Sequence, residues 1–257
     1  TFTMSRNQFL YILFIIVKQI LTLRYRGTFL GYVWTIINPL LMMAVMGIVF
    51  SAVFNAPFKD FVLFLFAGLV PWNFFNLLVN QNSATFVLNE GLMKKIYTPL
   101  ILFPLATSLA VLIESSLVTI ALVLIFFCFG LEVSLLTLLI IPFYVLIFIF
   151  CFGLGLIAAT LTVFFRDLQH IIPIILQGLF FISPILYDAK RFEGTSLSII
   201  LNLNPITPFI RIFRDIIYYG NSPSLNDLVI SSMLAFILFA IGFIFFSTMK
   251  NNIIFKL

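Results

Sequence analysis

Long apolar runs separated by short polar segments dominate the chain, and their lengths predict helices that cross a membrane. A spanning helix needs about 20 mostly apolar residues, because the hydrocarbon core of a bilayer is about 30 Å thick. Most of the runs that meet this requirement are bounded by charged residues, glycine or proline. The predicted spans are residues 32–54, 61–83, 100–130, 135–165, 168–187 and 228–249.

Residues 5–26, which precede the first span, predict an amphipathic helix lying in the membrane surface. The apolar run is interrupted at Lys18, at about half the length of a span. If the helix continues, Lys18 and Arg26 share one face, while Ile16 and Ile20 lie on another. The alternative is a signal peptide with Arg6 as its basic end. No small-residue cleavage site follows, which favours the interfacial helix.

Two further segments are too polar or too short to span. Residues 85–98 hold Glu90 four residues before Lys94, a spacing typical of a short cytoplasmic helix. Residues 196–219 contain two short apolar pieces, which predict a pair of helices that dip into or lie on the outer leaflet. In the second of these, Arg211 and Arg214 occupy a polar face. The opposite face holds Phe209, Ile212, Phe213 and Ile216.

Proline and glycine mark the irregular points of the spans. Pro39 removes a helical hydrogen bond, so we expect a kink in the first span. Pro173 and Pro184 predict breaks in the fifth span. Gly153 and Gly155 permit another helix to approach the fourth span closely.

The distribution of basic residues predicts the orientation. Arg24 and Arg26 form a pair of basic residues just before the first span and are followed by a turn that contains glycine. Lysine and arginine favour the cytoplasmic side of a membrane. With the N-terminus inside, nine basic residues lie in cytoplasmic segments and five in external ones. Both termini are therefore predicted to be cytoplasmic, in a multi-pass protein of the cytoplasmic (inner) membrane.

Composition agrees with an all-α integral membrane protein of one domain, residues 1–257. Hydrophobic residues make up 63% of the chain and charged residues 9%, whereas about a quarter of the residues of a soluble protein are charged. The net charge of +5 does not indicate nucleic-acid binding, because the basic residues lie at membrane boundaries rather than on one soluble face. Cys128 and Cys151 lie in apolar runs and are interpreted as buried apolar side chains.

Candidate chemistry is sparse. The sequence contains no nucleotide-binding loop and no zinc or hydrolase motif, and His170 is interpreted as a boundary residue beside a polar turn. Glu114 is the single ionisable residue deep in a predicted span, so it is a candidate functional group. The alternative, which we favour, is a carboxyl group hydrogen-bonded to serines or to a neighbouring helix. A transporter of this composition would take its energy from a partner.

Five segments together resemble the membrane-spanning permease of ATP-binding-cassette exporters that move lipid-linked polysaccharides such as O-antigen, capsule and teichoic acid. The resemblance covers nearly the whole chain in order. The segments are RYRGTFLGYVW with NPLL at 24–41, AGLVPWNFF at 67–75, NEGLMKKIYTPLILFPLA at 89–106, FFRDLQHIIPIILQGLFFISPILY at 164–187 and LNPITPFIRIFRDIIYYG at 203–220.

The resemblance implies a homodimer of this permease bound to two copies of a separate ATP-binding subunit. That subunit would hold ATP and magnesium, so this chain is expected to bind no metal or cofactor and to be no enzyme. Residues 85–98 match the family's coupling helix, which docks in a cleft of the ATPase. The implied contacts are Glu90, Lys94, Lys95 and Tyr97. A solvated charged loop is the alternative.

The resemblance also implies a polysaccharide channel at the dimer axis, lined by the first and fifth spans. Aromatic side chains there would suit the apolar faces of sugar rings. Alternatively, these aromatic residues face lipid or other helices, and Trp34 and Trp72 are membrane-interface anchors. The implied lining residues are Tyr32, Trp34, Asn38, Gln177, Phe180, Phe181, Ser183 and Tyr187.

Residues 196–219 resemble the family's external gate. Arg211 and Arg214 are expected to meet phosphate or acidic sugars, or to pair with Asp215 and lipid headgroups. The implied gate residues are Phe209, Arg211, Ile212, Arg214 and Ile216.

Two other classes of function stay open. An ion- or proton-coupled transporter would use Glu114. A membrane-embedded glycan transferase would need external acid and base groups such as Asp188, Glu193 or Asp227, whose spacing indicates no pair.

Overall fold

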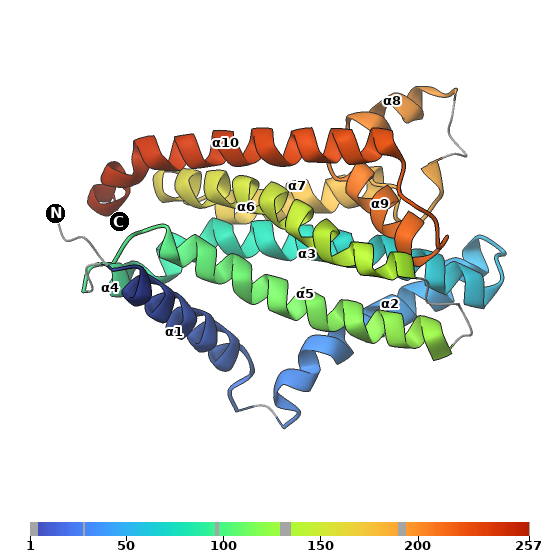
Figure 1. Ribbon diagram of the computed structural model, residues 1–257, viewed down its shortest axis with the longest axis horizontal. Helices are drawn as coiled ribbons and strands as arrows, with labels where there is room; N and C mark the ends of the chain where they lie inside the picture. Colours follow the sequence, from blue (N-terminus) through green and yellow to red (C-terminus); the bar gives the residue numbers. More distant parts are fainter. Residues whose placement is uncertain (1–4, 28, 96–97, 129–134, 190–193, 257) are drawn as a thin grey trace.

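The regular structure of the protein is helical throughout the residues that the structure describes. The computed structural model describes residues 5–27, 29–95, 98–128, 135–189 and 194–256. Helices follow one another along the chain, and the first helix (Arg6–Tyr25) begins at the same end of the bundle at which the last helix (Leu225–Lys256) ends (Figure 1). The predicted all-α membrane fold is confirmed.

Among the described residues, six helices are long and apolar enough to cross a membrane. The predicted number of spans therefore agrees, but the set differs by one helix from the predicted set. The qualifying helices are α1 (Arg6–Tyr25), α2 (Trp34–Val53), α3 (Phe58–Leu88), α5 (Leu102–Cys128), α6 (Ile140–Phe164, continued from a 3-10 turn at Leu135–Leu139) and α10 (Leu225–Lys256).

Helix α1 meets the length and composition of a span, although the sequence placed it in the membrane surface. Ser5 caps its first turn, with the reciprocal bond from the Gln8 side chain that defines a capping box. Ile16 and Val17 pack against a cluster that includes Phe103 of α5. Its interfacial location stays a prediction.

Helix α7 (Leu168–Ile182) is shorter than the fifth predicted span, residues 168–187. At 15 residues it is about 22 Å long, less than the bilayer core. It continues through Pro173, so the break predicted there is wrong, but it ends just before Pro184, as expected. Ser183 is extended because a proline excludes the helical conformation from the residue before it.

Helix α3 is the central element of the fold. It contacts α2, α5, α6, α7 and also α9 (Thr207–Ile217). It runs beyond the predicted span and includes residues 85–88, so the segment at 85–98 is not one separate helix. The helix ends at Asn89, which is followed by the four-residue helix α4 (Glu90–Met93). No helix breaker occurs in residues 84–88, so the backbone continues its hydrogen bonds to Asn89.

Helices α6 and α10 approach each other most closely at a pair of glycines. A Cβ atom added to Gly242 would lie 2.2 Å from the carbonyl oxygen of Gly153. The close contact expected at Gly153 is therefore present, and Gly155 similarly makes room for the side chain of Asn82 in α3. Helix α10 extends past the predicted end at residue 249 and includes Lys250.

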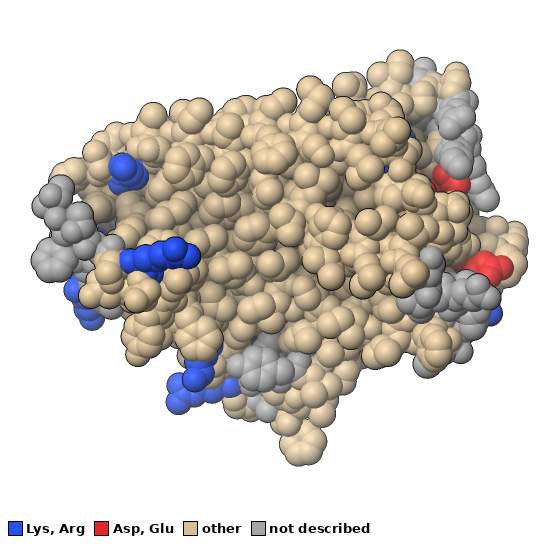
Figure 2. Space-filling model, in the orientation of Figure 1, with Lys and Arg blue, Asp and Glu red and all other residues tan. Residues whose placement is uncertain are grey.

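The bundle has two chemically different ends. On the face that Figure 2 shows, lysine and arginine gather at the end that holds both chain termini. Aspartate and glutamate appear at the opposite end, where α8 (Ser196–Leu203) and α9 lie. On this face the surface between the two ends shows few charged side chains, as a membrane-facing belt requires, and exposed large apolar residues such as Ile120, Phe236 and Ile244 lie on the long helices.

Candidate functional site

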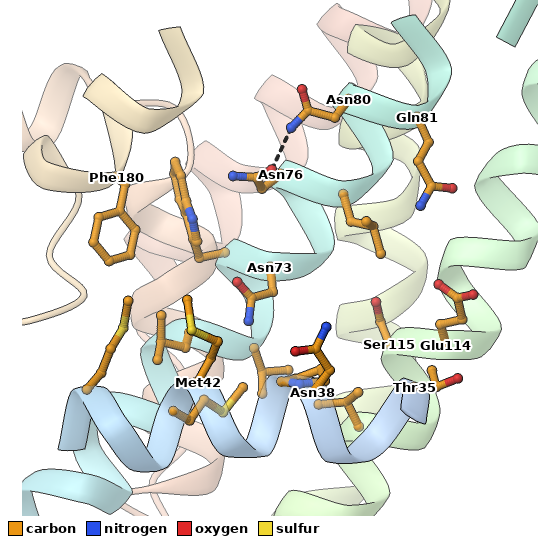
Figure 3. A pocket seen from close by; sticks show the side chains of 18 of the residues that line it. Thr35, Asn38, Met42, Asn73, Asn76, Asn80, Gln81, Glu114, Ser115 and Phe180 are labelled. Carbon is orange, nitrogen blue, oxygen red and sulfur yellow. Dashed lines mark hydrogen bonds between the residues drawn. The ribbon is translucent and has the colours of Figure 1, made fainter. Parts of the chain in front are cut away.

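A cavity of about 860 Å³ lies between α2, α3, α5 and α7. Thr35, Asn38 and Met42 of α2 face it from one side, and Asn73 of α3 faces them from the other (Figure 3). Phe180 of α7 closes one edge. This volume is within the range of small-molecule pockets in proteins.

A row of amide side chains on α3 gives the cavity its polar wall. Asn73, Asn76 and Asn80 are spaced three and four residues apart, which places them on one face of the helix together with Gln81. The Asn80 Nδ2 atom donates to Asn76 Oδ1 at 2.6 Å. Sequence reasoning missed this row. The signal was available, because four amides at helical spacing are rare in an apolar span.

Five of the eight side chains implied as channel lining border this cavity. Two others lie elsewhere. The Ser183 hydroxyl is buried, donating to the Leu179 carbonyl and accepting from Asn204 Nδ2 at 2.8 Å. The Tyr187 hydroxyl donates to carbonyl oxygens near the end of α7. The side chain of Tyr32 lies outside the described part of the chain. The five that border the cavity are Trp34, Asn38, Gln177, Phe180 and Phe181.

Trp72 also lines the cavity, from α3. Its side chain is only 2% exposed, and its ring meets that of Phe180 edge-on at a centroid distance of 5.6 Å. The alternative role as a membrane-interface anchor is therefore wrong for Trp72, because an anchor keeps its N–H group at the wet boundary. Trp34 is 40% exposed, so both interpretations of that residue stay open.

Glu114 forms an ion pair with Arg24 at the edge of the cavity. Nη1 of Arg24, at the C-terminal end of α1, donates to Oε2 of Glu114 in α5. Glu114 is therefore not the single ionisable group at this site. Of the two kinds of partner expected for its carboxyl group, the neighbouring helix is confirmed, since Arg24 belongs to α1, and the neighbouring serines are wrong. Ser116 instead donates to the carbonyl of Leu112 in its own helix. Packing of α1 against α5, which sequence periodicity does not reveal, brings the guanidinium to the carboxylate.

The external end holds a second, smaller cavity of about 370 Å³ near α8, α9 and the start of α10. Arg211 donates to Asn202 Oδ1 at 2.8 Å, and its Nη1 lies 3.5 Å from Asp227 Oδ1. Asp227 also accepts from the Ser224 hydroxyl at 2.9 Å. Asp188 lines the same cavity and accepts weakly from Tyr219. Each of the two carboxylates therefore has a hydrogen-bond or ion-pair partner of its own.

Arg214 does not face phosphate or headgroups as the sequence predicted. Its side chain is 4% exposed and donates to the carbonyl oxygens of Pro184 and Ile185 at 3.0 and 3.2 Å. The guanidinium carbon lies 3.7 Å from the centre of the Phe64 ring. Burial lowers the pKa of Arg214 to about 10. Gly68 leaves the space, because a Cβ atom there would lie 2.6 Å from Arg214 Nη2.

The remaining gate residues lie where the amphipathic pattern placed them. Phe209, Ile212 and Ile216 are buried in the main core, where α9 packs on α3 and α6. Helix α9 is therefore fixed by its apolar face, and Arg211 is the gate arginine that stays partly accessible.

Comparison with known proteins decides the family. A family model described as "ABC-2 type transporter" matches residues 11–218. This chain belongs to the ABC-2 type transporter membrane family. The resemblance found in the sequence is thereby confirmed.

Relatives within the ABC-2 family match along most of the chain. The O-antigen export system permease protein RfbA of Klebsiella pneumoniae is 31% identical over 245 residues, which cover 93% of this chain and 92% of that protein. RfbA of Myxococcus xanthus is 30% identical over 216 residues, 83% of each chain. The polysialic acid transport protein KpsM of Escherichia coli is 26% identical over 215 residues, 79% of this chain and 81% of that protein.

The segment that resembles the ABC-2 coupling helix is short and charged. Glu90 and Lys94, four residues apart, form an ion pair at 2.6 Å, and this hydrogen bond to Lys94 lowers the pKa of Glu90. Lys94 and Lys95 are both exposed. Tyr97 lies outside the described residues.

The groups required by a glycan transferase are not assembled in the described part of the chain. Asp188 and Asp227 border the external cavity, but Asp227 is bonded to Arg211 and Ser224. Glu193 lies outside the described residues. Within the described ranges, no three acidic, histidine or cysteine side chains gather in a way that could hold a metal ion.

Proposed function

We propose that this chain is the permease of an ATP-driven exporter that moves lipid-linked polysaccharide, most specifically O-antigen, across the cytoplasmic membrane. The observation that carries the proposal is the 31% identity to an O-antigen export permease along 93% of the chain. The cavity adds physical support, because amide groups and aromatic rings together suit sugars.

Two copies of the chain assemble in this proposal, with two copies of a separate ATP-binding subunit. The cavity-facing sides of α2 and α7 would then line a channel at the dimer axis, with Trp34, Asn38, Gln177, Phe180 and Phe181 along it. Tyr32, in the 3-10 turn (Gly31–Val33) that precedes α2, belongs to the same proposal. In this proposal both termini are cytoplasmic. The basic residues that gather at the end of the bundle where α1 begins and α10 ends support this orientation.

In this proposal, the segment around α4 couples ATP hydrolysis by the partner subunit to transport through this chain. Glu90, Lys94 and Lys95 present charge at the proposed cytoplasmic end, where they would dock on the ATP-binding subunit. Tyr97 is a further proposed contact. At the opposite end, α8 and α9 would act as the external gate, with Arg211 facing the exit and Arg214 holding α9 to the end of α7.

A proton-coupled mechanism through Glu114 has less support. A relay needs a second group that accepts and releases a proton. Among the described residues that line the cavity, Arg24 is the other ionisable group, and arginine does not release its proton in proteins.

Reconstitution in vesicles tests the proposal. The chain together with its ATP-binding partner is expected to move lipid-linked O-antigen when ATP is added, and the chain alone is expected to move none. Transport of glycan by the lone chain would contradict the proposal. So would a complete complex that hydrolyses ATP but exports no glycan.

A further inference from the structure

The surface of α1 carries a positive charge that the rest of the chain leaves unneutralised. No acidic residue precedes Asp60 in the sequence. Among the described residues, Arg24 is the one basic residue of this region that forms an ion pair, with Glu114. The other basic residues in or directly after α1 are exposed, and they are Arg6, Lys18 and Arg26. An anion from outside the chain can therefore bind here.

Contacts with α5 fix which side of α1 points away from the bundle. Ile16 and Val17 are buried against the cluster that includes Phe103 of α5. In the last turn of α1, Arg24 binds Glu114 of the same partner helix. The opposite side of α1 therefore faces the surroundings of the protein, and basic side chains lie at the surface beside this helix (Figures 1 and 2).

That outward side has an apolar part followed by a basic part. Tyr11, Phe14 and Ile15 are 67%, 65% and 42% exposed. Lys18 lies four residues after Phe14 and three after Ile15, so the three side chains share one face of the helix. Arg26, the extended C-cap residue, follows about two turns later. Apolar and aromatic side chains beside cations are typical of a helix that binds the surface of a membrane with anionic lipids.

The exposure of Lys18 favours a surface orientation of α1 over a spanning one. A spanning α1 would place this outward-facing lysine near the middle of the hydrocarbon core, which makes insertion less favourable by about a hundredfold. On the membrane surface, the same ammonium group reaches the headgroups while Tyr11 and Phe14 enter the acyl region. Anionic headgroups add attraction for each basic residue near the surface.

We propose that the outward face of α1 is a docking surface for anionic phospholipids. Lys18 and Arg26 bind the phosphate groups, and the acyl chains surround the side chains of Tyr11, Phe14 and Ile15. The ion pair between Arg24 and Glu114 is the positioning contact, because it holds the C-terminal end of α1 on α5 and so directs the docking surface outward. The inference is independent of the proposed function, since it names a lipid partner of α1 whatever the complex exports.

Native mass spectrometry of the purified chain in detergent measures the affinity for single lipid molecules. Phosphatidylglycerol is compared with phosphatidylcholine of the same acyl chains, and the unaltered chain is expected to bind phosphatidylglycerol more tightly. Combining Lys18→Gln with Arg26→Gln should weaken binding of phosphatidylglycerol by about thirtyfold, since each basic residue contributes about fivefold. Binding of phosphatidylcholine should stay unchanged. An unchanged affinity for phosphatidylglycerol in this double variant would refute the inference.

The matched control removes an exposed lysine from another helix. Lys59→Gln, in the first turn of α3, should keep the full affinity for phosphatidylglycerol. A loss as large as that of the double variant would show a general effect of charge and would remove the assigned site. These measurements use neither ATP nor glycan, so their failure would leave the proposed function standing.

Lys18→Leu distinguishes the surface orientation from a spanning one. The midpoint of thermal unfolding is measured in nanodiscs of phosphatidylcholine with and without phosphatidylglycerol. If Lys18 binds phosphate, the variant should lose part of the stabilisation that phosphatidylglycerol gives, whereas Lys18→Arg should retain it. In a spanning α1, leucine would remove a charge from the hydrocarbon core and raise the midpoint in both lipids. Such a rise, or a stabilisation equal to that of the unaltered chain, overturns the inference.

Discussion

Replacing Gly242 with alanine tests the close packing of α6 against α10. The added Cβ would lie 2.2 Å from the carbonyl oxygen of Gly153 and 2.9 Å from its carbonyl carbon. Both atoms belong to the backbone, so no side chain can rotate away. The helices would have to separate by about 1 Å to reach ordinary contact. Overpacking of this kind costs about 1–3 kcal/mol.

Thermal unfolding of the purified chain in detergent measures this cost. For a chain of this size, we expect the midpoint of Gly242→Ala to fall by about 5 °C. Gly91→Ala in α4 is the control, because a Cβ atom there meets nothing within 4 Å. Its midpoint should stay the same or rise slightly, since alanine favours the helix over glycine. Equal midpoints for the two variants would show that the glycine contact does not limit stability.

The spans could be predicted because their cause is local. Bilayer thickness fixes the length of an apolar run, and the residue before a proline disfavours the helical conformation, which ends α7 before Pro184 although Pro173 lies inside the same helix. The break predicted at Pro184 is present as the end of α7, whereas the predicted span continued beyond that proline to residue 187. The row from Asn73 to Asn80 also needed only helical spacing to be recognised.

The two arginine sites could not be predicted from spacing. Arg24 and Glu114 are 90 positions apart, and the docking of α1 on α5 brings them together. Arg214 lies on the polar stripe of its helix, so periodicity predicted exposure. The turn that follows α7 leaves the carbonyl groups of Pro184 and Ile185 without helical partners, and Arg214 bonds to them. Both interactions depend on elements that are distant in sequence.

Three further predictions concern coupling, substrate contact and the external end. Reversing the charges of Lys94 and Lys95 to glutamate should abolish glycan-stimulated ATP hydrolysis by the complex, and unchanged stimulation would remove α4 from the coupling pathway. Phe180→Ala should lower export in vesicles several-fold, whereas Tyr187→Phe, outside the cavity, should not; equal export rates would refute the assignment of the lining. Arg214→Leu leaves two buried carbonyl groups unpaired and removes the ring contact, so it should destabilise the chain by about 2–4 kcal/mol. Chemical denaturation measures this loss. If the variant is as stable as the unaltered chain, the guanidinium does not hold α9 to the end of α7, and the external helices are fixed by their apolar faces alone.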